Sequence, residues 1–194
     1  KPSQEVDLRL LFGGAISGLG CGESADERVA AAKAALATLR PEQLRIAVRG
    51  FSTPSDILDA VELGVDIIGS SYPFTLARKG QALTMPLRCH ATVEPPKKRR
   101  KSENGLHVLN LLDACHRKDP GPILESCGCH ACSHHTRAYI HHLLLAHEML
   151  ADVLLQIHNL YHLHNFVDEI RARIKDGTFN ELRGLIDADV APRV

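Results

Sequence analysis

The chain has 194 residues, and its 23 acidic and 23 basic side chains give a formal net charge of zero. This balance excludes a general electrostatic attraction to nucleic acid, so any such binding requires a local patch. Aromatic residues make up 4% and tryptophan is absent, which argues against a base-stacking surface. No apolar run approaches the roughly 18 residues of a membrane span.

Strand and helix patterns alternate through the first half of the chain. Strands are predicted over 8–12, ending at Gly13-Gly14, and over 44–48 and 65–68. Ser24 and Glu27 form a capping box before a helix over 29–39, and Thr53 is the N-cap of a second helix. This order is typical of parallel α/β packing. Three strands alone would expose sheet edges, so we expect a C-terminal fragment of a larger α/β domain or a required partner.

The second half of the chain has a different pattern. Residues 81–85 and 107–111 are predicted to pair as antiparallel strands, and helices are predicted over 137–150, 151–175 and 182–186. A polar segment between the strands carries the basic run 97–101, Lys-Lys-Arg-Arg-Lys. A solvated flexible loop is the favoured interpretation. A nuclear-import signal and a loop that contacts phosphate are the alternatives.

Three cysteines lie within six residues, at Cys127, Cys129 and Cys132. Cysteines this close rarely reach relaxed disulfide geometry. No N-terminal signal peptide is visible, so an oxidising compartment is not indicated. A disulfide with a spare thiol is therefore disfavoured, and the three thiols are predicted to bind zinc. With one histidine they would form a closed Cys3His shell, which stabilises a fold and leaves no open catalytic position.

The residues alone leave the fourth ligand open, because nine of the twelve histidines fall between His130 and His164. His158, on a predicted helix, is the candidate. Its rivals lie close to the cysteines or on the predicted helices: His130, His134, His135, His141, His142, His147, His162 and His164. The isolated Cys21, Cys89 and Cys115 are predicted to be buried, unreactive thiols.

The cysteine spacing, with His158 placed 26 positions after Cys132, resembles the zinc site of the tRNA-guanine transglycosylase family. Segments 136–143, 148–150 and 158–160 are also similar to that family, as are 16–23, 53–66 and 80–84. The resemblance covers most of residues 14–175 and selects His158 over its rivals. The family has a (β/α)8 barrel with a zinc subdomain near its C-terminal end. The resemblance therefore implies that the three strands are the last three of a barrel, in an α/β fold with a zinc-binding α+β subdomain.

The resemblance also implies a domain organisation and a base-recognition loop. The expected segments are 1–88 (part of the barrel), 89–106 (flexible basic loop), 107–176 (zinc-binding subdomain) and 177–194 (C-terminal tail). Segment 16–23 is similar to the family's glycine-rich loop that recognises the base. It implies a vestigial base loop at Gly18, Leu19, Gly20 and Glu23.

The chain departs from the family pattern at the catalytic position. The family reads Gly-Ile-Asp-x-Phe-Asp, and the second aspartate is the nucleophile at the end of the last barrel strand. Residues 64–69 read Gly-Val-Asp-Ile-Ile-Gly, so Gly69 occupies the nucleophile position. Asp66 matches the first aspartate and would face the other side of the strand. No catalytic residue is therefore expected.

The resemblance thus implies a non-catalytic accessory subunit with one structural Zn²⁺ per chain. Such a subunit would pair with a catalytic subunit and help to bind tRNA for the exchange of anticodon guanine by queuine. A homodimer is expected in isolation. The expected location is cytoplasmic, and the family implies an association with the mitochondrial outer membrane. A catalytically active transglycosylase and an unrelated zinc-stabilised interaction module are the alternatives.

Overall fold

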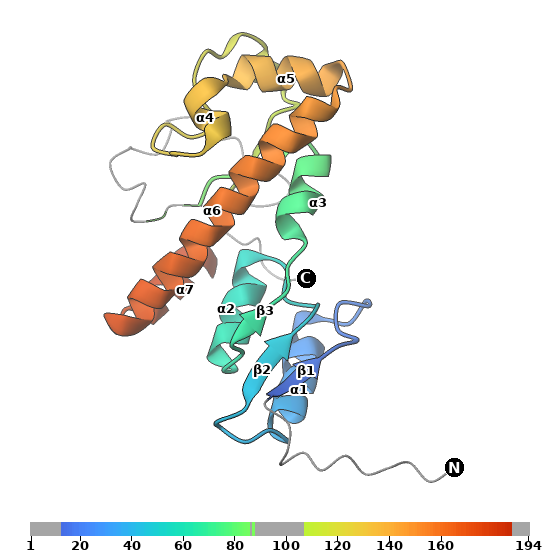
Figure 1. Ribbon diagram of the computed structural model, residues 1–194, viewed down its shortest axis with the longest axis vertical. Coiled ribbons are helices and arrows are strands. Elements are labelled where there is room, and N and C mark those ends of the chain that lie inside the picture. The colour runs from blue at the N-terminus through green and yellow to red at the C-terminus, as the bar shows by residue number, and fades with distance from the viewer. Residues whose placement is uncertain (1–12, 86, 88–106, 188–194) are drawn as a thin grey trace. The chain divides into compact units, whose positions relative to one another are not determined.

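The computed structural model describes residues 13–85, 87 and 107–187. They belong to two compact units that divide between Ser71 and Tyr72 (Figure 1). The expected basic loop over 89–106 lies outside the described residues. Within the described ranges, no helix has both the length and the apolar character needed to cross a bilayer.

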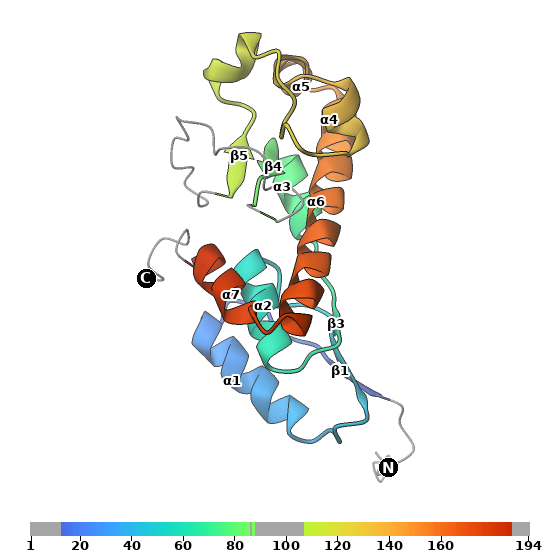
Figure 2. The ribbon, with the colours of Figure 1, turned by 90° about the vertical axis from the view of Figure 1, so that its left-hand side faces the viewer.

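The first unit contains a parallel three-stranded sheet with the strand order β1-β2-β3. The strands are β1 (Gly13–Ile16), β2 (Leu44–Ala47) and β3 (Ile67–Ile68). Helices α1 (Ala25–Leu36) and α2 (Pro54–Glu62) connect them and lie on the same face of the sheet (Figure 2). The predicted parallel α/β arrangement is confirmed for these elements.

Both predicted helix starts are confirmed by their capping hydrogen bonds. The Glu27 backbone N–H donates to Ser24 Oγ at 3.3 Å, and the Ser24 N–H donates to the Glu27 carboxylate at 2.8 Å. Thr53 and Asp56 repeat this exchange at α2. Each box satisfies two backbone donors that a helix start would otherwise leave unpaired. The helices pack on the sheet through one apolar cluster: Ile16, Ala32, Leu36, Ala47, Phe51, Ala60 and Val65.

The expectation that the first strand ends at Gly13-Gly14 is wrong, because in the described residues β1 includes both glycines and continues to Ile16. The run over 8–12 lies outside the described residues. Glycine is disfavoured in strands, which hid this strand from a propensity argument. The reason for glycine is close approach: a Cβ on Gly13 would lie 2.7 Å from the Leu44 Cβ, and one on Gly14 would lie 2.8 Å from the Leu39 side chain.

The second unit is organised around the long helix α6 (Met149–Lys175). Four preceding elements pack against it: α3 (Tyr72–Arg78), α4 (His130–His134), α5 (Arg137–Leu145) and strand β4 (Gln81–Leu83). The predicted antiparallel pair is confirmed, since β4 pairs with β5 (Val108–Asn110). A 3-10 helix, η3 (Ala114–Lys118), follows β5, and α7 (Phe179–Asp187) packs on the C-terminal half of α6.

The helix predicted over 137–150 ends earlier than expected. His147 has a φ of 55°, and its N–H donates to the Leu144 carbonyl at 3.2 Å. The Glu148 N–H donates to the Leu143 carbonyl at 3.0 Å. A hydrogen bond between residues five apart is typical of a helix C-terminus, and it marks the end of α5. Because no glycine or proline marks this turn, the local sequence carried no stop signal.

Candidate metal centre

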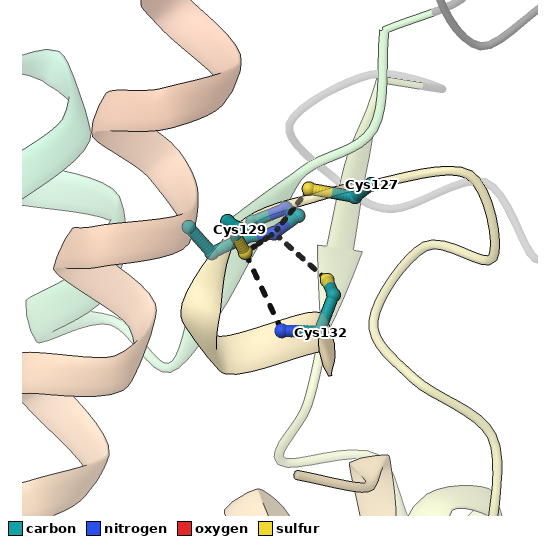
Figure 3. A group of neighbouring side chains, drawn as sticks. Cys127, Cys129 and Cys132 are labelled. Carbon is teal, nitrogen blue, oxygen red and sulfur yellow. Dashed lines mark hydrogen bonds between the residues drawn. The ribbon is translucent and has the colours of Figure 1, made fainter. Parts of the chain in front are cut away.

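The structure brings the four predicted ligands together in the second unit. Cys127 precedes α4, Cys129 is the N-cap of α4, Cys132 lies within it, and His158 lies on α6. His158 Nδ1 lies 3.7 Å from the Cys127 sulfur, 3.5 Å from the Cys129 sulfur and 3.3 Å from the Cys132 sulfur (Figure 3). All four donor atoms lie within 4.8 Å of one another.

These separations fit a tetrahedral zinc ion. Zn–S bonds of about 2.3 Å and a Zn–N bond of about 2.05 Å at tetrahedral angles place sulfur and nitrogen about 3.6 Å apart. His158 is fully buried, and Cys127 and Cys129 are nearly so. Four protein donors around one buried centre leave no position for water, so the donor set fits a structural ion.

The charge of the sulfur cluster also favours a cation. Hydrogen bonds from Cys127 and Cys132 lower the pKa of Cys129, whereas Cys127 and Cys129 raise the pKa of Cys132. The reason is that one thiolate accepts hydrogen bonds from its neighbours and repels a second negative charge. Burial lowers the pKa of His158, but Cys127 and Cys129 outweigh it and raise this pKa to about 9. A divalent ion would relieve the repulsion among the thiolates.

The orientation of His158 is set by strand β4, which sequence reasoning did not identify. His158 Nε2 lies 2.8 Å from the Leu83 carbonyl oxygen. Because a carbonyl can only accept, Nε2 carries the proton of the neutral ring, and the Nδ1 lone pair is then directed at the cysteines, where a metal ion would bind it. Metal-bound histidines usually have such an outer partner, which fixes the ring and the tautomer.

The adjacent Asn159 joins α6 to the same strand. Its Oδ1 accepts from the Leu83 N–H at 2.8 Å, and its Nδ2 donates to the Gln81 carbonyl at 2.9 Å and to the Pro73 carbonyl at 3.3 Å. Asn159 has no exposed surface. Its amide therefore pairs buried backbone groups beside the metal ligand and holds β4 in place for His158.

We expect Asn159→Ala to destabilise the second unit strongly. The substitution leaves the buried Leu83 N–H without its acceptor, at a cost of roughly 1–3 kcal/mol, and also removes the hydrogen bond to the Gln81 carbonyl. The urea unfolding midpoint should fall accordingly. Asn165→Ala is the matched control, because Asn165 lies on the same helix and is half-buried. Equal midpoints for the two variants would contradict the role assigned to Asn159.

The remaining predicted site residues lie in the first unit, after the carboxyl ends of its strands. The loop after β1 contains Gly18, Leu19, Gly20 and Glu23. Gly18 and Gly20 have φ values of 85° and 78°, which favour glycine. The Glu23 carboxylate accepts from the N–H groups of Gly20 and Cys21, and these bonds lower the pKa of Glu23. Glu23 therefore stabilises the loop in which it lies.

An ion pair that sequence reasoning missed supports this edge of the sheet. Arg28 Nη2 lies 3.3 Å from Asp56 Oδ1, and Arg28 Nη1 donates to the Gly50 carbonyl at 2.6 Å. Gly50 in turn packs against Leu19, because a Cβ on Gly50 would lie 2.6 Å from the Leu19 Cβ. The loops after β1 and β2 therefore contact each other, as parallel strands require.

Gly69 directly follows β3, at the same edge as these loops. Its N–H donates to the Ala47 carbonyl at 2.8 Å, and a Cβ built on it would collide with the Val48 carbonyl oxygen. Asp66 precedes β3 instead, where its carboxylate accepts from the Arg45 N–H at 2.8 Å. The carboxylate and the glycine therefore lie at opposite ends of the strand. Asp66 pairs a backbone N–H of the neighbouring strand β2.

Two predictions about isolated cysteines are wrong. Cys21 and Cys115 are exposed, because Cys21 lies in the glycine-rich loop and Cys115 on the short η3 helix. Cys89 lies outside the described residues. Of the rival histidines, the buried His141 has its Nδ1 2.7 Å from the Leu111 carbonyl oxygen and does not belong to the cysteine group.

The fold and the site define a mixed α/β protein whose second unit carries a Cys3His group that could hold a metal ion. The model of the queuine tRNA-ribosyltransferase family matches residues 4–189. The chain therefore belongs to the queuine tRNA-ribosyltransferase, or tRNA-guanine transglycosylase, family.

Similar proteins carry two different names. The queuine tRNA-ribosyltransferase accessory subunit 2 of Xenopus tropicalis is 33% identical over 189 residues, which cover 85% of this chain and 45% of that protein. The human accessory subunit 2 is 31% identical, over 75% of this chain and 40% of its own length. The queuine tRNA-ribosyltransferase of Desulfosudis oleivorans is 32% identical, over 92% of this chain and 41% of its own length. The chain thus spans less than half the length of these relatives.

Proposed function

We propose that this chain is part of a non-catalytic accessory subunit of a queuine tRNA-ribosyltransferase. The single observation that carries the proposal is Gly69, which occupies the position of the family's nucleophilic aspartate and is enclosed by the Val48 carbonyl. A glycine has no group that can attack the ribose, and the only nearby carboxylate of that segment, Asp66, lies at the other end of β3. The names of the accessory-subunit relatives support the same assignment.

In this proposal the first unit is the last part of a (β/α)8 barrel and the second unit is its zinc subdomain. The three parallel strands in chain order, with both helices on one face, are consistent with a barrel segment. Cys127, Cys129, Cys132 and His158 would hold one structural Zn²⁺, which joins the α4 segment to α6. The cytoplasmic or outer-mitochondrial location stays a prediction.

An exposed apolar stripe on α6 supports pairing with a catalytic subunit and, in isolation, with a second copy. Met149, Val153, Ile157 and Leu160 recur at helical spacing, and their side chains are 83%, 51%, 38% and 45% exposed. A neighbouring cavity of about 280 Å³ between α3 and α6 is lined by Phe74, Ala77, Val153 and Ile157, among others. Exposed apolar patches of this kind mark interaction surfaces. Binding of tRNA would then be a property of the assembled pair.

The proposal predicts that the full-length protein alone exchanges no labelled guanine in tRNA under single-turnover conditions. Addition of the catalytic subunit should produce exchange, and the two proteins should copurify. Val153→Glu should abolish copurification, because it places a charge within the apolar stripe. Ile174→Glu is the matched control on the same helix, since Ile174 is 53% exposed but distant along α6. Exchange by the protein alone would establish the catalytic alternative, and failure to copurify would overturn the proposed pairing with a catalytic subunit.

A further inference from the structure

Three imidazole rings gather on the surface beside the buried Cys3His group and take no part in it. His130 and His134 are exposed on α4, and His135 follows at its C-terminal end. The His130 ring centroid lies 4.3 Å from that of His134 and 5.9 Å from that of His135. Among the described residues these rings belong to no group of three or more potential metal ligands, so a site here would rest on a pair of rings.

The spacing of His130 and His134 suits chelation. Residues four apart on a helix project from the same face, with Cβ atoms about 5–6 Å apart. Their rings are stacked with 26° between the planes. Because the χ2 angle of histidine varies at low energetic cost, small rotations can direct one nitrogen of each ring to a shared ion. Histidines at this spacing on one helix face are a common pair of zinc ligands.

A hydrogen bond prepares His134 as a ligand. Its Nδ1 lies 3.1 Å from the His130 carbonyl oxygen. Since the carbonyl can only accept, Nδ1 carries the proton, and the Nε2 of the neutral ring keeps a free lone pair. Leu83 plays a similar part for His158, but there the carbonyl holds Nε2 and leaves Nδ1 free.

The backbone that carries the pair is also held in place. Cys129 caps α4 and accepts from the Cys132 N–H at 3.4 Å, while Ser133 Oγ donates to the Cys129 carbonyl at 2.9 Å. His135 stacks on Tyr139 with ring centroids 5.2 Å apart, which fixes a third imidazole beside the pair. A rigid presentation reduces the ordering cost of binding an ion.

We propose that His130 and His134 form a second, exchangeable site for a divalent transition-metal ion, with His135 at its edge. Imidazole donors select copper, nickel and zinc over magnesium and calcium, which prefer oxygen ligands. The two rings supply two of the ligands, and water supplies the rest. The site is independent of the proposed accessory role.

The test is a calorimetric titration of the zinc-loaded full-length protein with Ni²⁺, followed by measurement of its zinc content. We expect Ni²⁺ to bind without release of the resident zinc. His130→Asn and His134→Asn should each weaken Ni²⁺ binding on the order of 100-fold, because one ligand alone lacks the effective concentration that a chelating pair provides.

His164→Asn is the matched control, because His164 is an exposed histidine on α6, away from this pair in the sequence. It should bind Ni²⁺ like the wild type. His134→Asn lies outside the cysteine triplet, so it decides the question if His130→Asn disturbs the resident zinc. A wild-type protein that binds no Ni²⁺, or a His134→Asn variant that retains wild-type affinity, would overturn the proposal.

Discussion

Replacement of Cys129 by serine should abolish zinc binding and unfold the part of the second unit built on α4. Cys129 is a ligand of the proposed zinc ion, its sulfur caps α4, and that sulfur lies 3.5 Å from His158 Nδ1. Structural zinc brings a binding free energy on the order of 10 kcal/mol in small modules, and this energy becomes folding free energy. Metal analysis of the purified protein and thermal unfolding followed by circular dichroism would measure both effects.

Cys115→Ser is the control for this experiment. Cys115 is a free thiol in the same unit and is exposed on η3, outside the ligand group. That variant should keep one zinc per chain and the wild-type melting temperature. Wild-type protein with well below one zinc per chain would show that the ligand assignment is wrong. The same conclusion would follow from a Cys129→Ser variant with full zinc content.

The second large effect is expected for Gly69→Asp in the full-length protein. The new side chain restores the family's carboxylate in sequence, but its Cβ would meet the Val48 carbonyl oxygen and carbon. Strands β2 and β3 would have to move apart, at a cost of roughly 1–3 kcal/mol for overpacking. We therefore expect a lower unfolding midpoint and no covalent adduct with tRNA on a denaturing gel.

Gly184→Asp separates this steric effect from the addition of a carboxylate. A Cβ on Gly184 meets no atom within 4 Å, and the residue is exposed on α7. This variant should unfold at the wild-type midpoint. A stable Gly69→Asp protein that captures tRNA covalently would show that the end of β3 accepts a nucleophile, and that the chain differs from an active enzyme by one side chain.

Local chemistry explains why much of the fold could be predicted. Capping depends on residues three apart, so Ser24 with Glu27 identified the start of α1. Alternating apolar runs identified β2 and the β4–β5 pair. Short elements without a local signal were missed, and these include α3, α4 and the turn at His147. Their conformations depend on packing against α6, which no window of sequence describes.

The sequence by itself identified the three candidate sulfur ligands, because three thiols at spacings of two and three residues favour a shared metal ion over a disulfide with a spare thiol. Among nine nearby histidines the residues alone could not choose. Tertiary structure decided this point, because only His158 lies where the Leu83 carbonyl can hold one ring nitrogen while the other faces the cysteines. The enclosure of Gly69 by Val48 was likewise decided by the neighbouring strand. Local spacing indicates which side chains can bind a metal ion. The orientation of those side chains, and the space available at Gly69, depend on segments far apart in the chain.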